Sequence, residues 1–177
     1  MFRRGFRRGA PAQIPPLLRR AIALEQQGDF ASAAQAYEEF AARADLRGGP
    51  RAPLAFIQAG RMRFLAGDVA RGVEHIIRGL DLFAASGRIG KALNAGQRTV
   101  QELTARGYAS EAQKVSAHLK SILPAQMPAT VPSAPGRKPV LPTHCPDCGG
   151  PVRSDQVDWI DDATAECDYC GSPIRAE

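Results

Sequence analysis

The C-terminal part of the chain contains the stretch CPDCGGPVRSDQVDWIDDATAECDYC, residues 145–170. It holds two Cys-x-x-Cys pairs, Cys145/Cys148 and Cys167/Cys170, with eighteen residues between them, and the sequence has no other cysteine. Each pair presents two sulfur atoms from one short turn, and a β-hairpin between the turns would bring the pairs together. Four thiolates are the donor set of closed structural metal sites, in which the ion is tetrahedral. We therefore expect these four cysteines to hold one structural Zn²⁺.

The cysteine pattern leaves two other chemistries open. Iron binds four thiolates in rubredoxin-like sites, and a Cys-x-x-Cys pair can act as a redox dithiol. The redox role needs one exposed pair with a lowered pKa, whereas this chain has two matched pairs. His144 directly precedes Cys145, and we expect it to flank the site rather than to bind the ion.

The two cysteine turns resemble each other beyond the cysteines. Each is followed by a glycine, Gly149 or Gly171, which lets the backbone bend so that N–H groups point at sulfur. The segments 150–153 (GPVR) and 172–175 (SPIR) then echo each other, which suggests a pseudo-twofold pair. Residues 144–177 resemble the zinc ribbon family, and the resemblance implies a small β-hairpin domain built around the ion.

A unit of this size has little apolar material of its own. Val157, Trp159 and Ile160 lie between the two turns and are expected to form a small apolar layer beside the metal. Because so short a chain cannot bury enough apolar surface to hold itself together, metal binding must supply the missing stability. We expect residues 144–177 to unfold without metal.

Residues 17–123 have a helical pattern with an internal repeat. The segments GDFA, GDVA and GYAS begin at Gly28, Gly67 and Gly107, at spacings of 39 and 40 residues. In each segment the glycine can take a positive φ and end one helix. Asp29 and Asp68 can then cap the following helix with their carboxylates. The first helices of three helical hairpins are predicted at 17–27, 53–66 and 89–106, since apolar side chains recur there at helical spacing.

Three helix–turn–helix units in tandem resemble the tetratricopeptide repeat (TPR) family. The family-like positions of the three units are Leu24, Gly28, Phe30, Ala33, Tyr37 and Phe40; Gly60, Gly67, Val69 and Ile76; and Gly107, Ala112, Leu119 and Pro124. The family period is about 34 residues, shorter than the spacing here. The large aromatic of its first helix is replaced by Leu17 and Gly96 in the first and third units and is retained only in the second, as Phe56. The resemblance implies a mainly α fold, a TPR-like α-solenoid of about three helical hairpins followed by a small C-terminal zinc-ribbon β-hairpin domain. The alternative is an unrelated six-helix bundle.

Composition divides the chain into four parts. These are a basic flexible arm (1–14), a TPR-like helical repeat domain (15–123), a proline-rich linker (124–143) and the zinc ribbon (144–177). The linker has six prolines, which favour an extended, semi-rigid form. No apolar run reaches the roughly 18 residues that cross a bilayer, and no apolar segment follows the N-terminal arginines. We expect a cytoplasmic protein without a transmembrane segment.

The net charge of +5 is unevenly distributed. Residues 1–20 hold six arginines and no acidic residue, whereas residues 144–177 hold two basic and eight acidic side chains. The arm residues Arg3, Arg4, Arg7 and Arg8 stand beside phenylalanines, so the arm could meet an acidic protein groove, an anionic lipid surface or nucleic acid, or stay solvated. The acidic ribbon would repel phosphates. A basic protein surface is its expected partner, and the chain's own arm is one such surface.

The sequence favours a binding protein over an enzyme. It has no Gly-rich phosphate loop, and its three histidines form no recognisable set with a nucleophile and an acid. We expect a non-enzymatic adaptor or scaffold that docks a protein partner on the helical repeats and uses the ribbon as a second, tethered contact site. The candidate docking residues lie on first helices and are Gln58, Arg61, Arg63, Gln97, Arg98 and Gln101. Two alternatives are a nucleic-acid-associated regulator that binds through the arm and a structural subunit that self-associates, and the sequence leaves the oligomeric state open.

Overall fold

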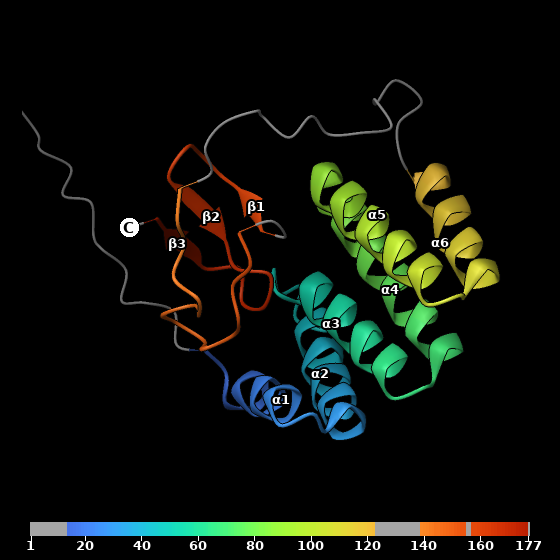
Figure 1. Ribbon diagram of the computed structural model, residues 1–177, viewed down its shortest axis with the longest axis horizontal. Helices are drawn as coiled ribbons and strands as arrows, with labels where there is room; N and C mark the ends of the chain where they lie inside the picture. The colour runs from blue at the N-terminus through green and yellow to red at the C-terminus, as the bar shows by residue number, and fades with distance from the viewer. Residues whose placement is uncertain (1–13, 123–138, 155–156, 177) are drawn as a thin grey trace, which may run out of the picture.

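The structure is a computed structural model that describes residues 14–122, 139–154 and 157–176 (Figure 1). Over these residues the chain is mainly α-helical, with a small antiparallel sheet near the C-terminus. The helices are α1 (Pro16–Gln26), α2 (Phe30–Asp45), α3 (Ala52–Leu65), α4 (Val69–Ala85), α5 (Ile89–Ala105) and α6 (Ala109–Ile122). The strands are β1 (Asp158–Trp159), β2 (Thr164–Glu166) and β3 (Pro173–Arg175). The arm arginines Arg3, Arg4, Arg7 and Arg8, and most of the linker, lie outside the described residues.

The predicted first helices of the three hairpins are confirmed to within one residue at each end, as α1, α3 and α5. Gly28, Gly67 and Gly107 have φ values of 78°, 88° and 84°, so each ends its helix in the left-handed region as expected. Asp29 and Asp68 cap α2 and α4, because each carboxylate accepts the N–H of the third residue after it, at 3.1 and 3.3 Å. The short segments that begin at Gly28, Gly67 and Gly107 therefore determine where one helix ends and the next begins.

Each helix packs against the next one along the chain, and α4 also packs against α6. Figure 1 shows the helices following one another from α1 at the lower edge to α6 at the upper right. The apolar residues predicted for this purpose lie inside: Tyr37, Ile76, Leu80 and Val115 are fully buried. None of the helices in the described part of the chain combines the length and the hydropathy needed to cross a membrane.

Glycines allow α3 and α4 to approach closely. A Cβ atom on Gly60 would lie 2.7 Å from the carbonyl oxygen of Gly72, and one on Gly72 would lie 2.3 Å from the ring of Phe64. Gly79, two turns further along α4, would meet the carbonyl oxygen of Pro53 at 2.9 Å. The backbones touch where these side chains are missing, so the interface has no room for an extra methyl group.

A charged cluster centred on Glu38 joins α2, α3 and α4. Arg63 donates two hydrogen bonds to its carboxylate, at 2.5 and 2.8 Å, and Arg71 and His75 contact it at 3.3 and 2.9 Å. Burial would raise the pKa of Glu38, but the hydrogen bond from Arg63 and the neighbouring positive charges outweigh it, so the pKa is lowered. Arg63, a predicted docking residue, is thus part of a structural tie between helices and is only 12% exposed.

The sheet has the order β1-β2-β3, and both strand pairs are antiparallel. The predicted hairpin corresponds to β1 and β2, and the segment after the second cysteine turn adds the third strand. Ala165 pairs with Ile174, and both side chains are buried. Val157 is buried as predicted, but the placement of Ile160 in the apolar layer is wrong: it is 59% exposed, because it lies in the turn after β1.

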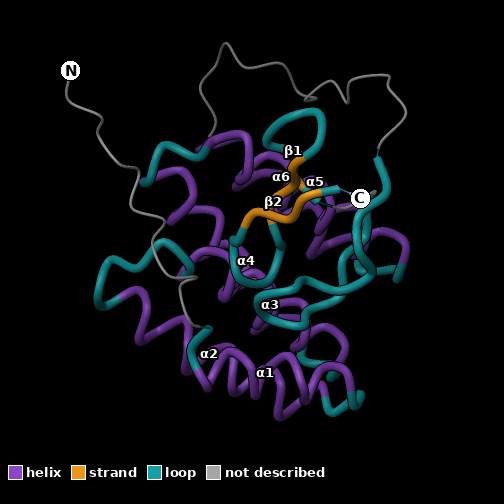
Figure 2. The backbone as a smooth tube through the Cα atoms, turned by 90° about the vertical axis from the view of Figure 1, so that its left-hand side faces the viewer, coloured by secondary structure: helices purple, strands orange, loops and turns teal. Residues whose placement is uncertain are grey.

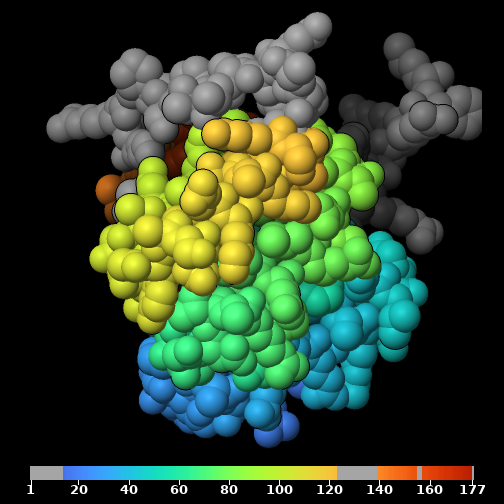
Figure 3. All heavy atoms as spheres, turned by 90° about the vertical axis from the view of Figure 1, so that its right-hand side faces the viewer, coloured from blue at the N-terminus to red at the C-terminus, as the bar shows by residue number. Residues whose placement is uncertain are grey.

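The four-cysteine unit (139–154 and 157–176) packs directly on the helices. One apolar cluster contains Leu18, Ile22 and Tyr37 from the helices together with the four cysteines, Tyr169 and Ile174. From the side of the unit, its loops and strands lie in front of the helices (Figure 2). The opposite face is formed by the helices, and little of the unit is visible there (Figure 3).

Replacing Gly60 by alanine will destabilise the protein by about 1–3 kcal/mol, because the new methyl group meets backbone that cannot move aside. The matched control is Gly90→Ala in α5, where a Cβ would have nothing within 4 Å. That change should stabilise the helix by about 0.5–1 kcal/mol. Urea denaturation followed by circular dichroism measures both effects, and equal midpoints for the two variants would contradict the close-contact account.

Candidate metal centre

The four sulfur atoms lie together and away from solvent. All of them are within 4.8 Å of one another, and all four cysteines are buried. The Sγ atoms of Cys145 and Cys170 are 3.8 Å apart, and those of Cys148 and Cys167 are 3.7 Å apart. A tetrahedron with metal–sulfur bonds of about 2.3 Å has sulfur–sulfur edges of about 3.8 Å. The cluster therefore has the size and donor chemistry to hold one tetrahedral metal ion.

The two cysteine turns have the same backbone structure. In each, the N–H of the glycine that follows the second cysteine donates to the carbonyl of the first, at 2.9 Å, and both Gly149 and Gly171 have a φ of 72°. Backbone N–H groups also point at sulfur, from Gly150 to Cys148 and from Tyr169 to Cys167, both at 3.4 Å. Such bonds stabilise thiolates, so each turn is prepared to bind a cation.

Hydrogen bonds among the sulfurs separate the proton affinities of the four thiols. The bond with Cys148 lowers the pKa of Cys145 to about 7, and the bond with Cys145 lowers the pKa of Cys170. For the other two thiols the effect has the opposite sign: hydrogen bonding with Cys145 raises the pKa of Cys148 and the pKa of Cys167. A metal ion requires thiolates, so its binding would displace the remaining protons and would strengthen as the pH rises. The His144 side chain is exposed and contacts Thr143 at 3.1 Å.

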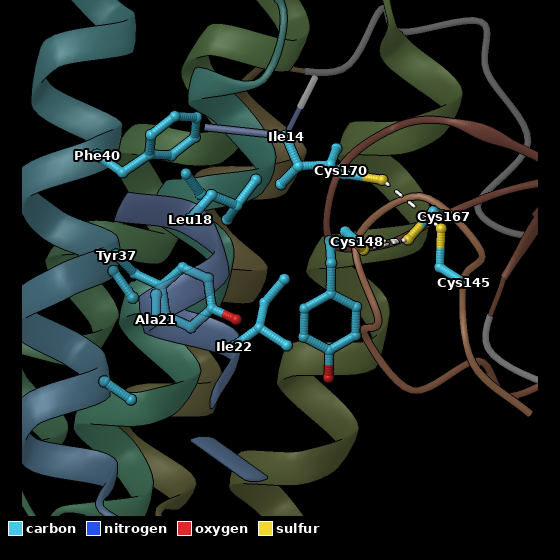
Figure 4. Packing of buried hydrophobic residues seen from close by; sticks show 14 of the residues in the cluster. Ile14, Leu18, Ala21, Ile22, Tyr37, Phe40, Cys145, Cys148, Cys167 and Cys170 are labelled. Atoms are coloured by element: carbon cyan, nitrogen blue, oxygen red, sulfur yellow. Dashed lines mark hydrogen bonds between the residues drawn. The ribbon is translucent and has the colours of Figure 1, made fainter. Parts of the chain in front are cut away.

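Side chains of the helical part bind the backbone of both cysteine turns. Three carbonyl oxygens are involved: Gln26 donates to Gly149 (2.9 Å), Arg51 to Cys170 (2.8 Å) and Gln58 to Asp168 (3.2 Å). The donors come from the last residue of α1, from the N-cap of α3 and from the middle of α3. Figure 4 shows the sulfur atoms beside the apolar side chains Ile14, Leu18 and Ile22. The four cysteines are thus positioned by the helices as well as by their own turns.

Glu25 at the end of α1 joins the second cysteine turn to two helices. Its carboxylate accepts a hydrogen bond from Tyr37 of α2 at 2.8 Å and another from Tyr169 at 2.9 Å. Burial, reinforced by the charge of Glu25, raises the pKa of both tyrosines, so both stay neutral donors. Tyr169 also packs on the first turn, since a Cβ on Gly150 would lie 2.8 Å from its ring.

The acidic four-cysteine unit meets a basic side of α5. Lys91 pairs with Glu166, and Arg98 lies 3.5 Å from Asp158 and 3.3 Å from Asp168. Burial raises the pKa of Asp168 to about 6, and the charge of Arg98 opposes that shift. The sequence predicts that the acidic residues 144–177 bind a basic protein surface, and in this structure α5 of the same chain provides one.

Four of the six predicted docking residues line one cleft between α3, α5 and the four-cysteine unit. The cleft has a volume of about 730 Å³, and the four residues are Gln58, Arg61, Arg98 and Gln101. Gln58 is 2% exposed because the second cysteine turn covers it, whereas Gln101 is exposed. Gln97 is half-buried on α5 and is not among the lining residues, and Arg63 lies in the Glu38 cluster.

Sequence reasoning missed the helix residues that bind the cysteine turns. Glu25, Gln26 and Arg51 are polar, and in a single sequence they look like solvent-facing residues of an amphipathic helix. One signal was available, because Tyr169 places a large aromatic between two metal ligands in a unit with almost no core of its own.

Comparison of the chain with protein-family models, with curated proteins and with solved structures gave no match.

Substitution Gln58→Leu will weaken the attachment of the four-cysteine unit, because it leaves the half-buried Asp168 carbonyl without its donor. The expected cost is about 1–3 kcal/mol. The control is Gln101→Leu, which changes an exposed glutamine of the same cleft. Thermal unfolding of the metal-loaded proteins measures the difference, and an unchanged midpoint for Gln58→Leu would show that this hydrogen bond contributes nothing.

Proposed function

We propose that this chain is a non-enzymatic protein-interaction scaffold, in which a zinc ribbon is folded onto a TPR-like helical solenoid. The observation that carries the proposal is the binding of the two cysteine turns by Gln26, Arg51 and Gln58. These donors recognise main-chain carbonyls, which every polypeptide offers. The side of the helices that holds its own ribbon therefore has the chemistry of a docking surface.

The position of the ribbon supports the solenoid interpretation. Its contacts come from α1, from α3 with its N-cap, and from α5, which are the first helices of the three successive hairpins. The resemblance to tetratricopeptide repeats implies that first helices line the inner surface, where such proteins receive their ligands. The ribbon occupies part of that surface, and the cleft beside it is the part left open.

Zinc is the ion that the site favours. The four thiolates leave no position for water, and zinc in such closed sites stabilises a fold without redox chemistry. The metal would be one structural Zn²⁺ held by Cys145, Cys148, Cys167 and Cys170. Iron in a rubredoxin-like site is the alternative that the same donors allow.

The histidines support a binding role rather than catalysis. His75 lies 2.9 Å from Glu38 and stacks on Phe56, with ring centroids 6.0 Å apart. His118 of α6 lies 2.7 Å from Asp81 of α4. Both rings therefore connect helices, and neither contacts the cysteine cluster. A role in proton transfer needs an imidazole placed against a substrate site.

The open cleft suits a polar segment of a partner protein. Its walls carry both signs of charge, with Arg61 3.6 Å from Glu102 and Arg98 beside Asp158. A partner segment with polar and charged side chains would replace these ion pairs with ion pairs of its own. Charge complementarity would then govern the specificity of binding more than its affinity.

The purified protein will contain one zinc ion per chain, measured by elemental analysis. Cys148→Ser will lower the affinity more than about tenfold, because one thiolate ligand is lost. Competition with a chromogenic chelator measures that affinity. Stoichiometric iron with visible thiolate-to-iron absorbance would favour the alternative ion, and a chain without stoichiometric metal would refute the structural site.

Affinity capture from native lysate with zinc retained tests the docking role. Gln101→Trp fills the cleft from an exposed position, so it should abolish capture of the partner without loss of stability. Gln113→Trp places the same side chain on an exposed position of α6 outside the cleft and should leave capture unchanged. Equal capture by the two variants would place the docking site elsewhere.

A further inference from the structure

Three large apolar side chains are exposed among the residues that the structure describes: Leu46 (89%), Val140 (72%) and Ile160 (59%). Two of them have charged neighbours of opposite sign. Leu46 lies at the end of α2 between Asp45, which pairs with Arg78 of α4, and Arg47, whereas Ile160 precedes Asp161 and Asp162 in the turn between β1 and β2. The molecule therefore has one apolar and basic site and one apolar and acidic site.

The basic site is a groove of about 730 Å³ between the start of α1, the end of α2 and the second cysteine turn. Apolar side chains line it, among them Leu17, Phe40 and Leu54. Leu46 directly precedes Arg47, one of the lining residues. We call this site the basic groove. Its lining includes four arginines, at positions 43, 47, 51 and 88.

Among the described residues, carboxylates pair with only one of the four arginines of the basic groove, Arg43. Arg51 and Arg88 donate to the backbone carbonyls of Cys170 and Pro50, which carry no net charge. No carboxylate among the described residues pairs with Arg47, and Arg43 pairs only with Glu39 on the surface. Glu166 is the one acidic residue of the lining, and Lys91 pairs with it. An occupant with negative charge is therefore favoured.

The acidic site is the turn formed by residues 160–162, which we call the acidic turn. The N–H of Ile160 donates to the Thr164 carbonyl at 2.8 Å, and the Asp161 carboxylate accepts the N–H of Ala163 at 2.8 Å. This backbone hydrogen bond lowers the pKa of Asp161, so the group stays charged. The turn thus presents an apolar side chain and two carboxylates from a backbone that is already ordered, which reduces the entropy lost on binding.

We propose that the basic groove of one copy of this chain receives the acidic turn of a second copy. The turn is not an occupant of its own groove, since Ile160 is exposed and none of the three turn residues lines the groove. In Figure 1 the turn lies at the end of the sheet away from α1 and α2. The contact joins two different surfaces, so it either closes into a symmetric assembly by exchange of turns or continues from copy to copy. It is independent of the partner cleft.

Sedimentation velocity of the metal-loaded full chain over a wide range of concentrations tests the proposal. The wild type should self-associate, and the association should weaken as salt rises, because the contact is electrostatic at its rim. Arg47→Glu and Asp162→Arg should each weaken it by about tenfold, since each places like charges together. The combined variant Arg47→Glu/Asp162→Arg should recover affinity, because attraction between the two positions is restored. Lys120→Glu, the same charge change on an exposed residue of α6, should have no effect.

The outcomes separate this contact from other occupants. A wild type that remains monomeric up to its solubility limit would overturn the proposal and leave the groove to the acidic segment of another protein. Association that is lost in Asp162→Arg but kept in Arg47→Glu would overturn it too, since the turn would then bind a different basic surface such as the N-terminal arm. Association that neither change affects would place the contact on another face. Circular dichroism shows that each variant is folded.

Discussion

Hydrogen bonds from helix side chains to the carbonyl groups of the cysteine turns are the interaction on which the rest of the structure depends. A metal-binding turn folds its N–H groups inward, toward sulfur, and leaves carbonyls facing outward. Gln26, Arg51 and Gln58 supply the donors that these carbonyls need. The dependence is mutual, because Gln58 is buried and would lose its partner if the second turn moved away. A metal ion bound by the four cysteines would therefore also determine whether Gln58 of α3 keeps its hydrogen-bond partner.

Apolar contacts and ion pairs add to the hydrogen bonds that hold the four-cysteine unit on the helices. The four-cysteine unit is too small to bury a core of its own, and it shares one with α1 and α2, where Leu18, Ile22 and Tyr37 contact the same cluster as the sulfurs. The Glu25 carboxylate connects that core to the second turn through two tyrosine hydroxyls. Ion pairs with Lys91 and Arg98 compensate the acidic charge of the unit on the side of α5. Apolar burial, hydrogen bonding and charge all favour the same docked position, which is the consistency expected of a specified structure.

The helices and the clustering of the four cysteines could be predicted from the sequence, because their signals are local. A glycine with positive φ followed by a capping aspartate defines a helix boundary within a few residues. Each Cys-x-x-Cys turn places its two sulfur atoms close together through its own local backbone structure. The docked arrangement could not be predicted, since a glutamine that binds a carbonyl far along the chain looks like one that faces water. Gly72 and Gly79 weaken a helix by propensity alone, and only the neighbouring backbone of α3 explains them. Ile160 was misplaced because it was assigned to the core from its apolar character alone, whereas it lies in the exposed turn after β1.

The central claim is that the metal-bound turns and the first helices form one cooperative unit rather than two domains on a linker. Hydrogen–deuterium exchange of the full chain, with metal bound and after its removal, tests this most directly. The account predicts that metal removal accelerates amide exchange in α1 and α3 as well as in the four-cysteine unit, because the helices lose the partners of their polar side chains and part of their core. Faster exchange confined to residues 139–176, with α1 and α3 unchanged, would contradict it.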